Sequence, residues 1–183
     1  MQNLNYGVIG NCSTAALISE KGAIEWLCFP EFDSPSVFAA ILDRQKGGHF
    51  GFKVTSDYKV TQSYVPHTNI LSTHFESEEG AFDVVDFMPC YPTSDGKDFY
   101  RPAEIYRYIR WAKGRPRMKV DYRPAPNYAR GKTIYNVTSQ YVETYSSVEN
   151  KDRQYLYSSL DLKKVVNHDE ITLEKDEFFL FSF

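Results

Sequence analysis

The sequence predicts an all-β fold: an antiparallel β-sandwich with one short helix. Apolar stretches of strand length recur about every ten residues, which is the spacing of a sandwich and not of β-α-β units. The chain holds 14 Tyr and 13 Phe, and such rings pack well on half-buried strands. With 183 residues, 42% of them hydrophobic, the chain is long enough to bury a core as one domain.

A tight hairpin is predicted near the N-terminus. Ala15–Ser19 and residues 24–29 are apolar stretches, and the four residues between them include Gly22, which can adopt the positive φ that such turns need. Pro30 then ends the second strand, because proline has no N–H group for the ladder.

The one predicted helix covers residues 36–42. Ser34 offers a capping hydroxyl, and Pro35 suits the first helical position. In a helix, one face would be shared by Val37, Phe38, Ile41 and Leu42.

The rest of the chain is predicted as strands, turns and one long loop. Residues 49–54 alternate as a half-buried strand does, and residues 58–65 are expected to pair with them. Residues 71–88 are predicted to form a second hairpin. Residues 89–102 contain three prolines and are predicted to form a long surface loop. Further strands are expected at residues 103–112, 118–125, 133–139, 141–147, 154–162, 171–174 and 177–183.

Several motifs in the first 130 residues carry a family resemblance. Residues 9–19 have the pattern I-G-N-x-x-x-A-A-L-I-S, and residues 22–43 the pattern G-x-I-E-W-L-C-F-P-x-F-D-S-P-S-V-F-A-A-I-L-D. Shorter matches follow at residues 64–71, 85–89 and 123–128. The chain thereby resembles the opening of bacterial and archaeal proteins of glycoside hydrolase family fifteen, which includes glucoamylases, glucodextranases and some trehalases.

The resemblance implies a domain without catalytic residues. In that family the first domain is a β-sandwich, and a later barrel of paired helices carries two catalytic glutamates. Nothing after Lys132 resembles that barrel, so residues 1–183 are expected to be the N-terminal domain of a longer enzyme, with its own C-terminal catalytic domain as partner.

The resemblance also implies what the whole enzyme would do. It would hydrolyse α-linked glucose units with inversion, as a glucoamylase or alternatively a trehalase. This domain would support the barrel and help to shape its substrate cleft. Alone it is expected to be inactive and prone to self-association through its uncovered apolar surface.

The candidates for contact with a substrate cleft or a neighbouring domain are Trp26, Phe32, Asp33 and Ser34. Aromatic faces stack on sugar rings, and carboxylates hydrogen-bond to sugar hydroxyls. The alternative is structural, since Trp26 lies in a predicted strand, where tryptophan is typical of a core, and Asp33 precedes Ser-Pro-Ser as a turn or cap residue does. An autonomous carbohydrate-binding module is the competing function.

The carboxylates of this chain do not predict a catalytic pair. Inverting glycosidases hold two carboxyl groups about 6.5 to 9.5 Å apart. Asp83 and Asp86 should lie on opposite faces of a strand, and Glu25, Glu31 and Asp33 are close only in the sequence. Solvated charges, turn caps or interface contacts are expected instead.

Positive charge is concentrated between Arg101 and Lys132. Ten Lys or Arg stand there against two acids, a local charge of +8 (10 − 2) in a chain of net charge −3. Basic residues among aromatics can bind single-stranded nucleic acid. Because the chain is acidic and shows no RNA-recognition motif, we expect a solvated strand face or a contact with an acidic partner domain, and no nucleic-acid partner.

The remaining composition predicts neither metal nor cofactor. Cys12, Cys28 and Cys90 are odd in number and lack C-x-x-C spacing, so they are expected to be small buried hydrophobes. The four histidines lack ligand spacing, and no phosphate-loop pattern occurs. The N-terminus shows neither a signal sequence nor an apolar span, which predicts a cytoplasmic protein without a membrane partner.

Overall fold

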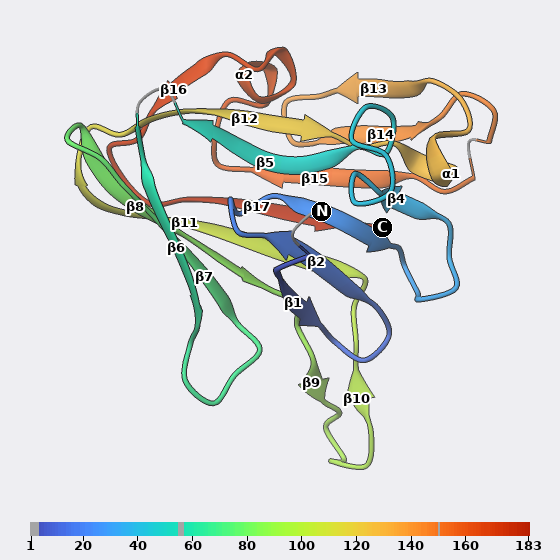
Figure 1. Cartoon of the computed structure of the whole chain (residues 1–183). Coiled ribbons are helices and arrows are strands. Elements are labelled where there is room, and N and C mark those ends of the chain that lie inside the picture. The colour runs from blue at the N-terminus through green and yellow to red at the C-terminus, as the bar shows by residue number, and fades with distance from the viewer. Residues whose placement is uncertain (1–3, 55–56, 150) are drawn as a thin grey trace.

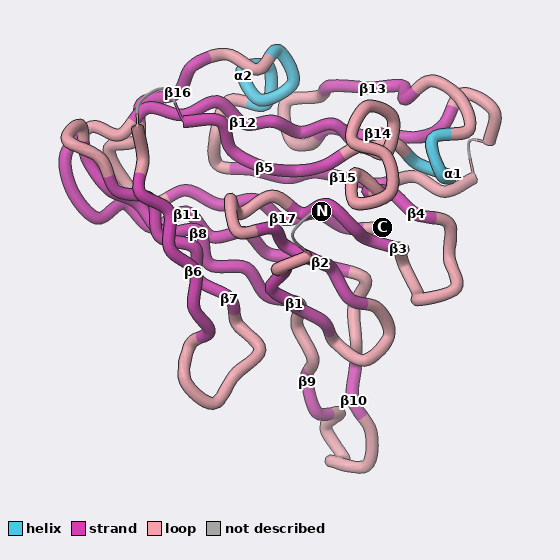
Figure 2. Tube along the Cα trace, viewed as in Figure 1, coloured by secondary structure: helices cyan, strands magenta, loops and turns pink. Residues whose placement is uncertain are grey.

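The computed structural model describes residues 4–54, 57–149 and 151–183 and confirms the all-β sandwich (Figure 1). Two large antiparallel sheets pack face to face; α2 lies outside them against β12, and α1 lies at one edge in contact with β4 and β14 (Figure 2). The seven-stranded sheet has the order β1-β2-β3-β5-β12-β16, with β4 paired to β3. The eight-stranded sheet has the order β13-β14-β15-β17-β11-β8-β7-β6.

The strands of the seven-stranded sheet are β1 (Tyr6–Gly10), β2 (Ala15–Ser19), β3 (Ile24–Cys28), β4 (Ser36–Phe38), β5 (His49–Val54), β12 (Arg117–Arg123) and β16 (Glu170–Thr172). Those of the eight-stranded sheet are β6 (Lys59–Tyr64), β7 (Leu71–Glu76), β8 (Gly80–Phe87), β11 (Glu104–Gly114), β13 (Thr133–Val137), β14 (Val142–Ser146), β15 (Gln154–Ser158) and β17 (Glu177–Ser182). A separate ribbon pairs β9 (Tyr91–Pro92) with β10 (Phe99–Tyr100). The helical segments are α1 (Pro126–Ala129) and α2 (Leu162–Asn167).

Both predicted hairpins are confirmed, as β2–β3 and β7–β8. The predicted partner of residues 58–65 is wrong. β6 pairs with β7 in the eight-stranded sheet, whereas β5 pairs with β12 and β3 in the other sheet. The chain crosses between the sheets after β5, so two strands adjacent in sequence belong to different layers.

The predicted helix at residues 36–42 is also wrong. Ser36–Phe38 forms β4, which pairs antiparallel with β3, and turns follow it. The backbone N–H of Ala39 donates to the carbonyl oxygen of Gly47 at 2.6 Å, a bond across the β4–β5 connection that replaces a helical one. Residues 36–40 are all buried in succession, and a surface helix with one apolar face cannot bury five consecutive side chains.

Several elements were not expected from the sequence. β1 pairs with β2 at the sheet edge, β9 and β10 pair within the predicted loop at residues 89–102, and α2 follows the predicted strand at residues 154–162. The Asp161 carboxylate caps α2 by accepting from the backbone N–H of Lys163 at 2.9 Å. α1 is a single turn rather than a regular helix, because Asn127, Tyr128 and Ala129 have φ values of 56°, 54° and 57°.

The core between the sheets is built largely from aromatic rings. Phe50 of β5 packs edge to face on Tyr122 of β12, with centroids 5.1 Å apart, and on Phe179 of β17 at 5.3 Å. Phe29 stacks on Phe181 across the layers at 5.6 Å. Tyr122 also packs edge to face on Phe181 at 6.2 Å, so β5, β12 and the residue after β3 all contact β17 and the rings hold the two sheets together.

A buried ion pair between neighbouring strands of the eight-stranded sheet faces this core. Arg107 of β11 donates from Nε and Nη2 to the carboxylate of Asp86 in β8, at 2.7 and 3.0 Å, and both side chains are inaccessible to solvent. The same guanidinium donates to the backbone carbonyl oxygens of Phe50 in β5 and of Gly22 in the β2–β3 turn, both of which belong to the other layer. Asp83, as predicted, faces the opposite side, where it bonds His74 at 2.7 Å. Arg107 therefore links both layers through hydrogen bonds.

The expectation that all three cysteines are buried is wrong for two of them. Cys28 in β3 is buried, whereas Cys12 and Cys90 are exposed, and all three are free thiols. Both exposed residues lie in connections, Cys12 in the β1–β2 turn and Cys90 between β8 and β9. Turns lie on the surface, which outweighs the general preference of cysteine for the interior.

Candidate functional site

The loop that carries most of the predicted site residues lies on the surface at one end of the sandwich. Phe32 is 61% exposed and Asp33 is exposed, both in residues 30–35 between β3 and β4. The Ser34 hydroxyl accepts from the backbone N–H of Glu31 at 3.1 Å, so it closes a turn and does not cap a helix.

Trp26 has a different environment from the loop residues. It lies in β3 opposite Leu17 of β2 and is only half-buried, so it does not belong to the fully buried core that its strand position favoured. Its role in substrate or domain contact stays a prediction.

The loop at residues 30–35 is one of three connections that lie together. The backbone N–H of Phe32 donates to the carbonyl oxygen of Ser13 in the β1–β2 turn at 3.0 Å. In the same turn the Asn11 side chain donates to the carbonyl oxygen of Pro102 at 2.9 Å, at the end of the segment that carries β9 and β10. Residues 11–14, 30–35 and 89–102 therefore form one surface, here called the loop face (Figure 1).

Asn11 organises this surface from within. It is 2% exposed, and its side-chain oxygen accepts from the backbone N–H groups of Ser13 and Thr14 at 3.1 and 3.2 Å. Because the buried Asn11 amide bonds both the β1–β2 turn and the Pro102 carbonyl, it fixes the conformation of the turn and the distance between the turn and residue 102. Sequence reasoning missed Asn11, although it stands in the I-G-N motif.

The C-terminal residue borders the loop face. The backbone N–H of Phe183 donates to the carbonyl oxygen of Ala103 at 3.2 Å. Its ring packs edge to face on Phe29, with centroids 6.2 Å apart. The end of β17 and the loop face are thus parts of one continuous surface.

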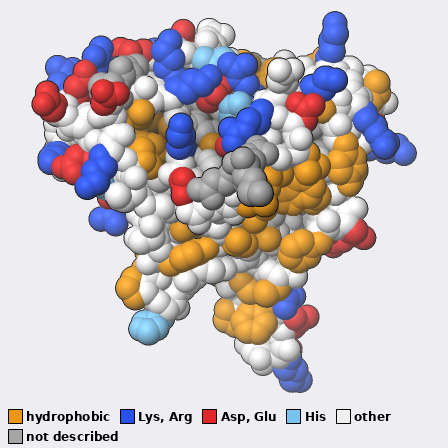
Figure 3. Space-filling view, in the orientation of Figure 1, with side chains coloured by type: hydrophobic (Ala, Val, Ile, Leu, Met, Phe, Trp, Pro, Cys, Tyr) orange, Lys and Arg blue, Asp and Glu red, His pale blue; other side chains and the backbone are white. Residues whose placement is uncertain are grey.

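Exposed aromatic rings distinguish the loop face from an ordinary end of a sandwich. The exposed rings are Phe32 at 61%, Tyr91 at 51%, Phe99 at 50%, Tyr100 at 63% and Phe183 at 40%. Figure 3 shows hydrophobic side chains gathered over the lower half of the molecule, including the protruding β9–β10 ribbon, and charged side chains over the upper half. The three rings of the ribbon were not singled out from the sequence; the signal was aromatic residues within a proline-rich loop.

The chemistry of the loop face favours contact rather than catalysis. Its loops are held by backbone hydrogen bonds and by the Asn11 amide, and aromatic residues such as those it exposes are enriched where proteins bind one another. Within residues 4–54, 57–149 and 151–183, no group of three or more His, Cys, Asp or Glu side chains is placed to hold a metal ion. Nor does the described part of the chain contain a helix long and apolar enough to cross a membrane.

The basic segment between Arg101 and Lys132 is a strand face that pairs largely with this chain's own acids. Lys113 bonds Glu76 at 2.6 Å, and Arg117 bonds Glu79 at 2.6 Å. The expectation of a solvated strand face is confirmed for these residues. Arg107 is the exception, because it is buried in the core.

Comparison with known proteins identifies the family. The model of the family described as trehalase-like, N-terminal matches residues 5–150. A trehalase of Thermoplasma volcanium is 36% identical over 132 residues, which cover 70% of this chain and 20% of that protein. A trehalase of Thermoplasma acidophilum is 33% identical over 155 residues, 83% of this chain and 26% of the relative. Trehalase 1 of Sulfolobus acidocaldarius is 51% identical over 85 residues, 45% of this chain and 14% of the relative.

These matches place the similarity in a small part of each relative. The chain spans between 14% and 26% of the length of these three trehalases. No solved structure shows a significant match to the chain. In agreement with the resemblance to glycoside hydrolase family fifteen, the chain belongs to the trehalase-like N-terminal family.

Proposed function

We propose that this chain is the non-catalytic N-terminal domain of a trehalase-like glycoside hydrolase, and that its loop face docks on the catalytic domain of that enzyme. The observation that carries the proposal is the family match over residues 5–150, in relatives several times longer than this chain. The relatives are named trehalases, which favours trehalose as substrate of the whole enzyme over the α-glucan of a glucoamylase.

The position of the loop face supports its role as the docking surface. A polypeptide that continued beyond Phe183 would start beside Ala103 and the loop face, so a following domain would meet this surface first. Rings that are half or more exposed lose contact with water when such a domain covers them, which stabilises association.

Within this arrangement the loop at residues 30–35 has the role of a cleft wall. Phe32 and Asp33 extend into solvent from a turn that Ser34 and the Ser13 carbonyl hold in place. An aromatic face beside a carboxylate suits a sugar ring, with the ring stacked and its hydroxyls hydrogen-bonded. The catalytic acid and base belong to the other domain in this proposal.

The test measures association and activity with separate polypeptides. The catalytic domain encoded by the same gene is produced on its own, and its binding to this chain is measured by calorimetry. Trehalose hydrolysis is assayed for each polypeptide and for the mixture. We expect this chain alone to be inactive, the two to bind, and Phe32→Ala with Tyr100→Ala to weaken binding at least about tenfold, since central aromatic contacts contribute about 2 kcal/mol or more each.

A matched control is Tyr108→Ala, an exposed aromatic residue on β11 outside the loop face, which should leave binding unchanged. Equal weakening by both sets of variants would contradict docking through the loop face. Saturable heat when this chain alone is titrated with maltooligosaccharides or trehalose would instead support an autonomous carbohydrate-binding module that uses the same exposed rings.

A further inference from the structure

The outer side of the eight-stranded sheet carries aromatic rings where a solvated sheet face would carry charges. Successive side chains of a strand point to opposite faces of the sheet. In β11 the side chains of Ile105 and Ile109 are inaccessible to solvent within the core, so Tyr106 and Tyr108 point to the outer side. We propose that two copies of this chain associate face to face through this outer side, with β11 of each copy at the centre.

Apolar side chains continue across three strands on this side. Tyr106 is the register partner of Phe87 in β8 and of Leu180 in β17. The ring of Tyr106 stacks on that of Phe87, with centroids 5.1 Å apart. The next outward row of the same three strands is also apolar. The two rows, here called the outer aromatic face, consist of Phe87, Tyr106 and Leu180 in one row and Val85, Tyr108 and Phe178 in the other.

The outer aromatic face is open to solvent at its centre. Tyr108 is 43% exposed and Phe178 is 37% exposed, and the other four residues are half-buried. A solvated strand face alternates apolar and polar residues, whereas strands that are covered on both sides have nearly continuous apolar sequences. β17 has the second pattern, with F-F-L-F at residues 178–181. This strand therefore favours a covered outer side, and contiguous exposed apolar surface is typical of interaction sites.

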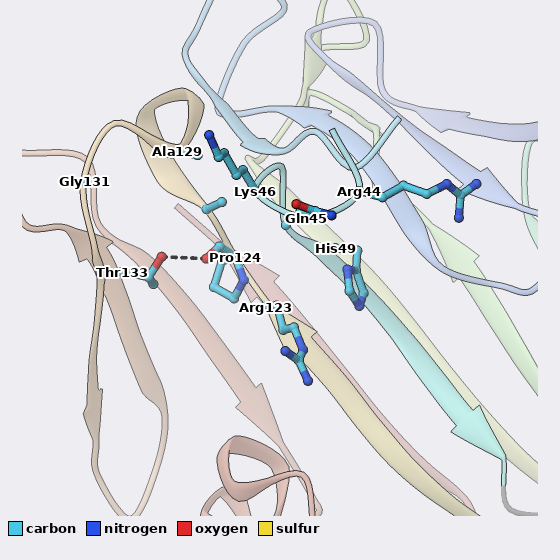
Figure 4. Close-up of a pocket in the computed structure, with 11 residues that line it drawn as sticks. Arg44, Gln45, Lys46, His49, Arg123, Pro124, Ala129, Gly131 and Thr133 are labelled. Carbon is cyan, nitrogen blue, oxygen red and sulfur yellow. Dashed lines mark hydrogen bonds between the residues drawn. The ribbon is translucent and has the colours of Figure 1, made fainter. Parts of the chain in front are cut away.

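The outer side of the seven-stranded sheet is polar, and its charges have partners within this chain. Asp121 of β12 bonds His49 Nε2 and Lys53 Nζ, each at 2.8 Å. It also accepts from Arg123 Nε at 2.6 Å. Burial raises the pKa of Asp121, but the hydrogen bonds from these three groups outweigh burial and hold the pKa well below its usual range. Beside them, the guanidinium groups of Arg44 and Arg123 point in different directions into solvent (Figure 4), as on an ordinary solvated face.

The charges on the outer side of β11 are complementary to those of a second copy. Glu104 is the first residue of β11, and Arg110 lies on the same outer side beyond the two tyrosines. In the part of the chain that the structure describes, neither of them forms an ion pair. Asp83, the register partner of Arg110, bonds His74 at 2.7 Å instead. The outer side of β11 thus has an acid at one end and a base at the other.

A two-fold axis at the level of Arg107 makes this strand complementary to itself. The axis lies between the two copies and crosses β11 at right angles, so that Tyr106 of one copy meets the partner's Tyr108. Glu104 likewise meets the partner's Arg110, and the symmetry repeats both contacts. Sheets that pack face to face lie about 10 Å apart with strand directions within about 30° of each other, a spacing that interdigitating rings fill.

The experiment is sedimentation velocity of this chain at rising concentration, in which we expect a monomer–dimer equilibrium. Arg110→Glu should weaken the dimer at least about tenfold, because the symmetry sets two new acids against the two copies of Glu104. Glu104→Arg should weaken it as well, since it sets arginine against arginine. The double variant Glu104→Arg/Arg110→Glu exchanges the charges and should restore association.

The matched control is Lys119→Glu, which changes the net charge as Arg110→Glu does, at an exposed position of β12 in the other sheet. It should leave the dimer unchanged, and circular dichroism verifies that all variants are folded. The proposal is wrong if the chain stays monomeric up to about 0.1 mM, if Lys119→Glu weakens the dimer as much as Arg110→Glu, or if the exchanged charges do not restore it.

Self-association through the loop face would give a different result. Phe32→Ala combined with Tyr100→Ala should leave the dimer intact. Loss of the dimer in that double variant, with no effect of Arg110→Glu, would assign self-association to the loop face and overturn the proposal. Because no catalytic domain takes part in the measurement, its outcome is independent of the docking proposal.

Discussion

Replacement of Arg107 by methionine should strongly destabilise the sandwich. Methionine fills a similar volume but leaves the Asp86 carboxylate, inaccessible to solvent, without its partner. Removing one member of a buried ion pair costs about 3–5 kcal/mol. The carbonyl oxygens of Phe50 and Gly22 lose a donor as well, at about 1–3 kcal/mol for each buried group that stays unpaired. Even about 3 kcal/mol is a large part of the 5–15 kcal/mol, roughly, that stabilises a typical domain.

Urea unfolding followed by tryptophan fluorescence measures this loss from the shift in midpoint at unchanged slope. The double variant Arg107→Met/Asp86→Leu removes both charges and should recover part of the stability lost in the single variant. Arg117→Met, which breaks an exposed pair with Glu79, should have a much smaller effect than Arg107→Met. A loss below about 1 kcal/mol in Arg107→Met, or no recovery in the double variant, would refute the stabilising role assigned to the buried pair.

Three further predictions concern other buried or crowded groups. Because the pKa of Asp121 is lower in the folded than in the unfolded chain, its stabilising effect is present above about pH 4 and declines as the pH falls toward the folded value; Asp121→Asn should flatten this acid-side loss in unfolding titrations. Gly47→Ala should lower the thermal midpoint clearly, since the new Cβ would lie 2.2 Å from a backbone carbonyl oxygen. In a thiol titration of the native chain, Cys12 and Cys90 should react quickly and Cys28 only after unfolding; fast reaction of all three would contradict the assigned burial.

Local sequence patterns predicted the hairpins and the exposed loops well, because alternation and turn residues act over a few positions. They did not predict the sheet to which a strand belongs. Residues 58–65 have a good strand pattern, but their partner depends on where the chain crosses between layers. The apolar residues of 36–42 have the spacing of one helical face. The segment nevertheless forms a strand and turns, because five successive residues are buried and the strand pairs with β3.

The candidate surfaces show the same limit. The loop at residues 30–35 was visible in the family motif, whereas its neighbours on the loop face come from residues 91–100 and from Phe183, far along the chain. The charge count between Arg101 and Lys132 pointed to a set of cations, many of which bond acids of this chain.

The central claim is that this sandwich serves a catalytic domain encoded with it. The most direct measurement is the nucleotide sequence of the gene on the 3′ side of the codon for Phe183. We expect an open reading frame that continues for several hundred codons and encodes paired amphipathic helices with acidic residues between them. A stop codon directly after Phe183 would contradict the docking role, and it would leave ligand binding by the isolated sandwich as the activity to explain.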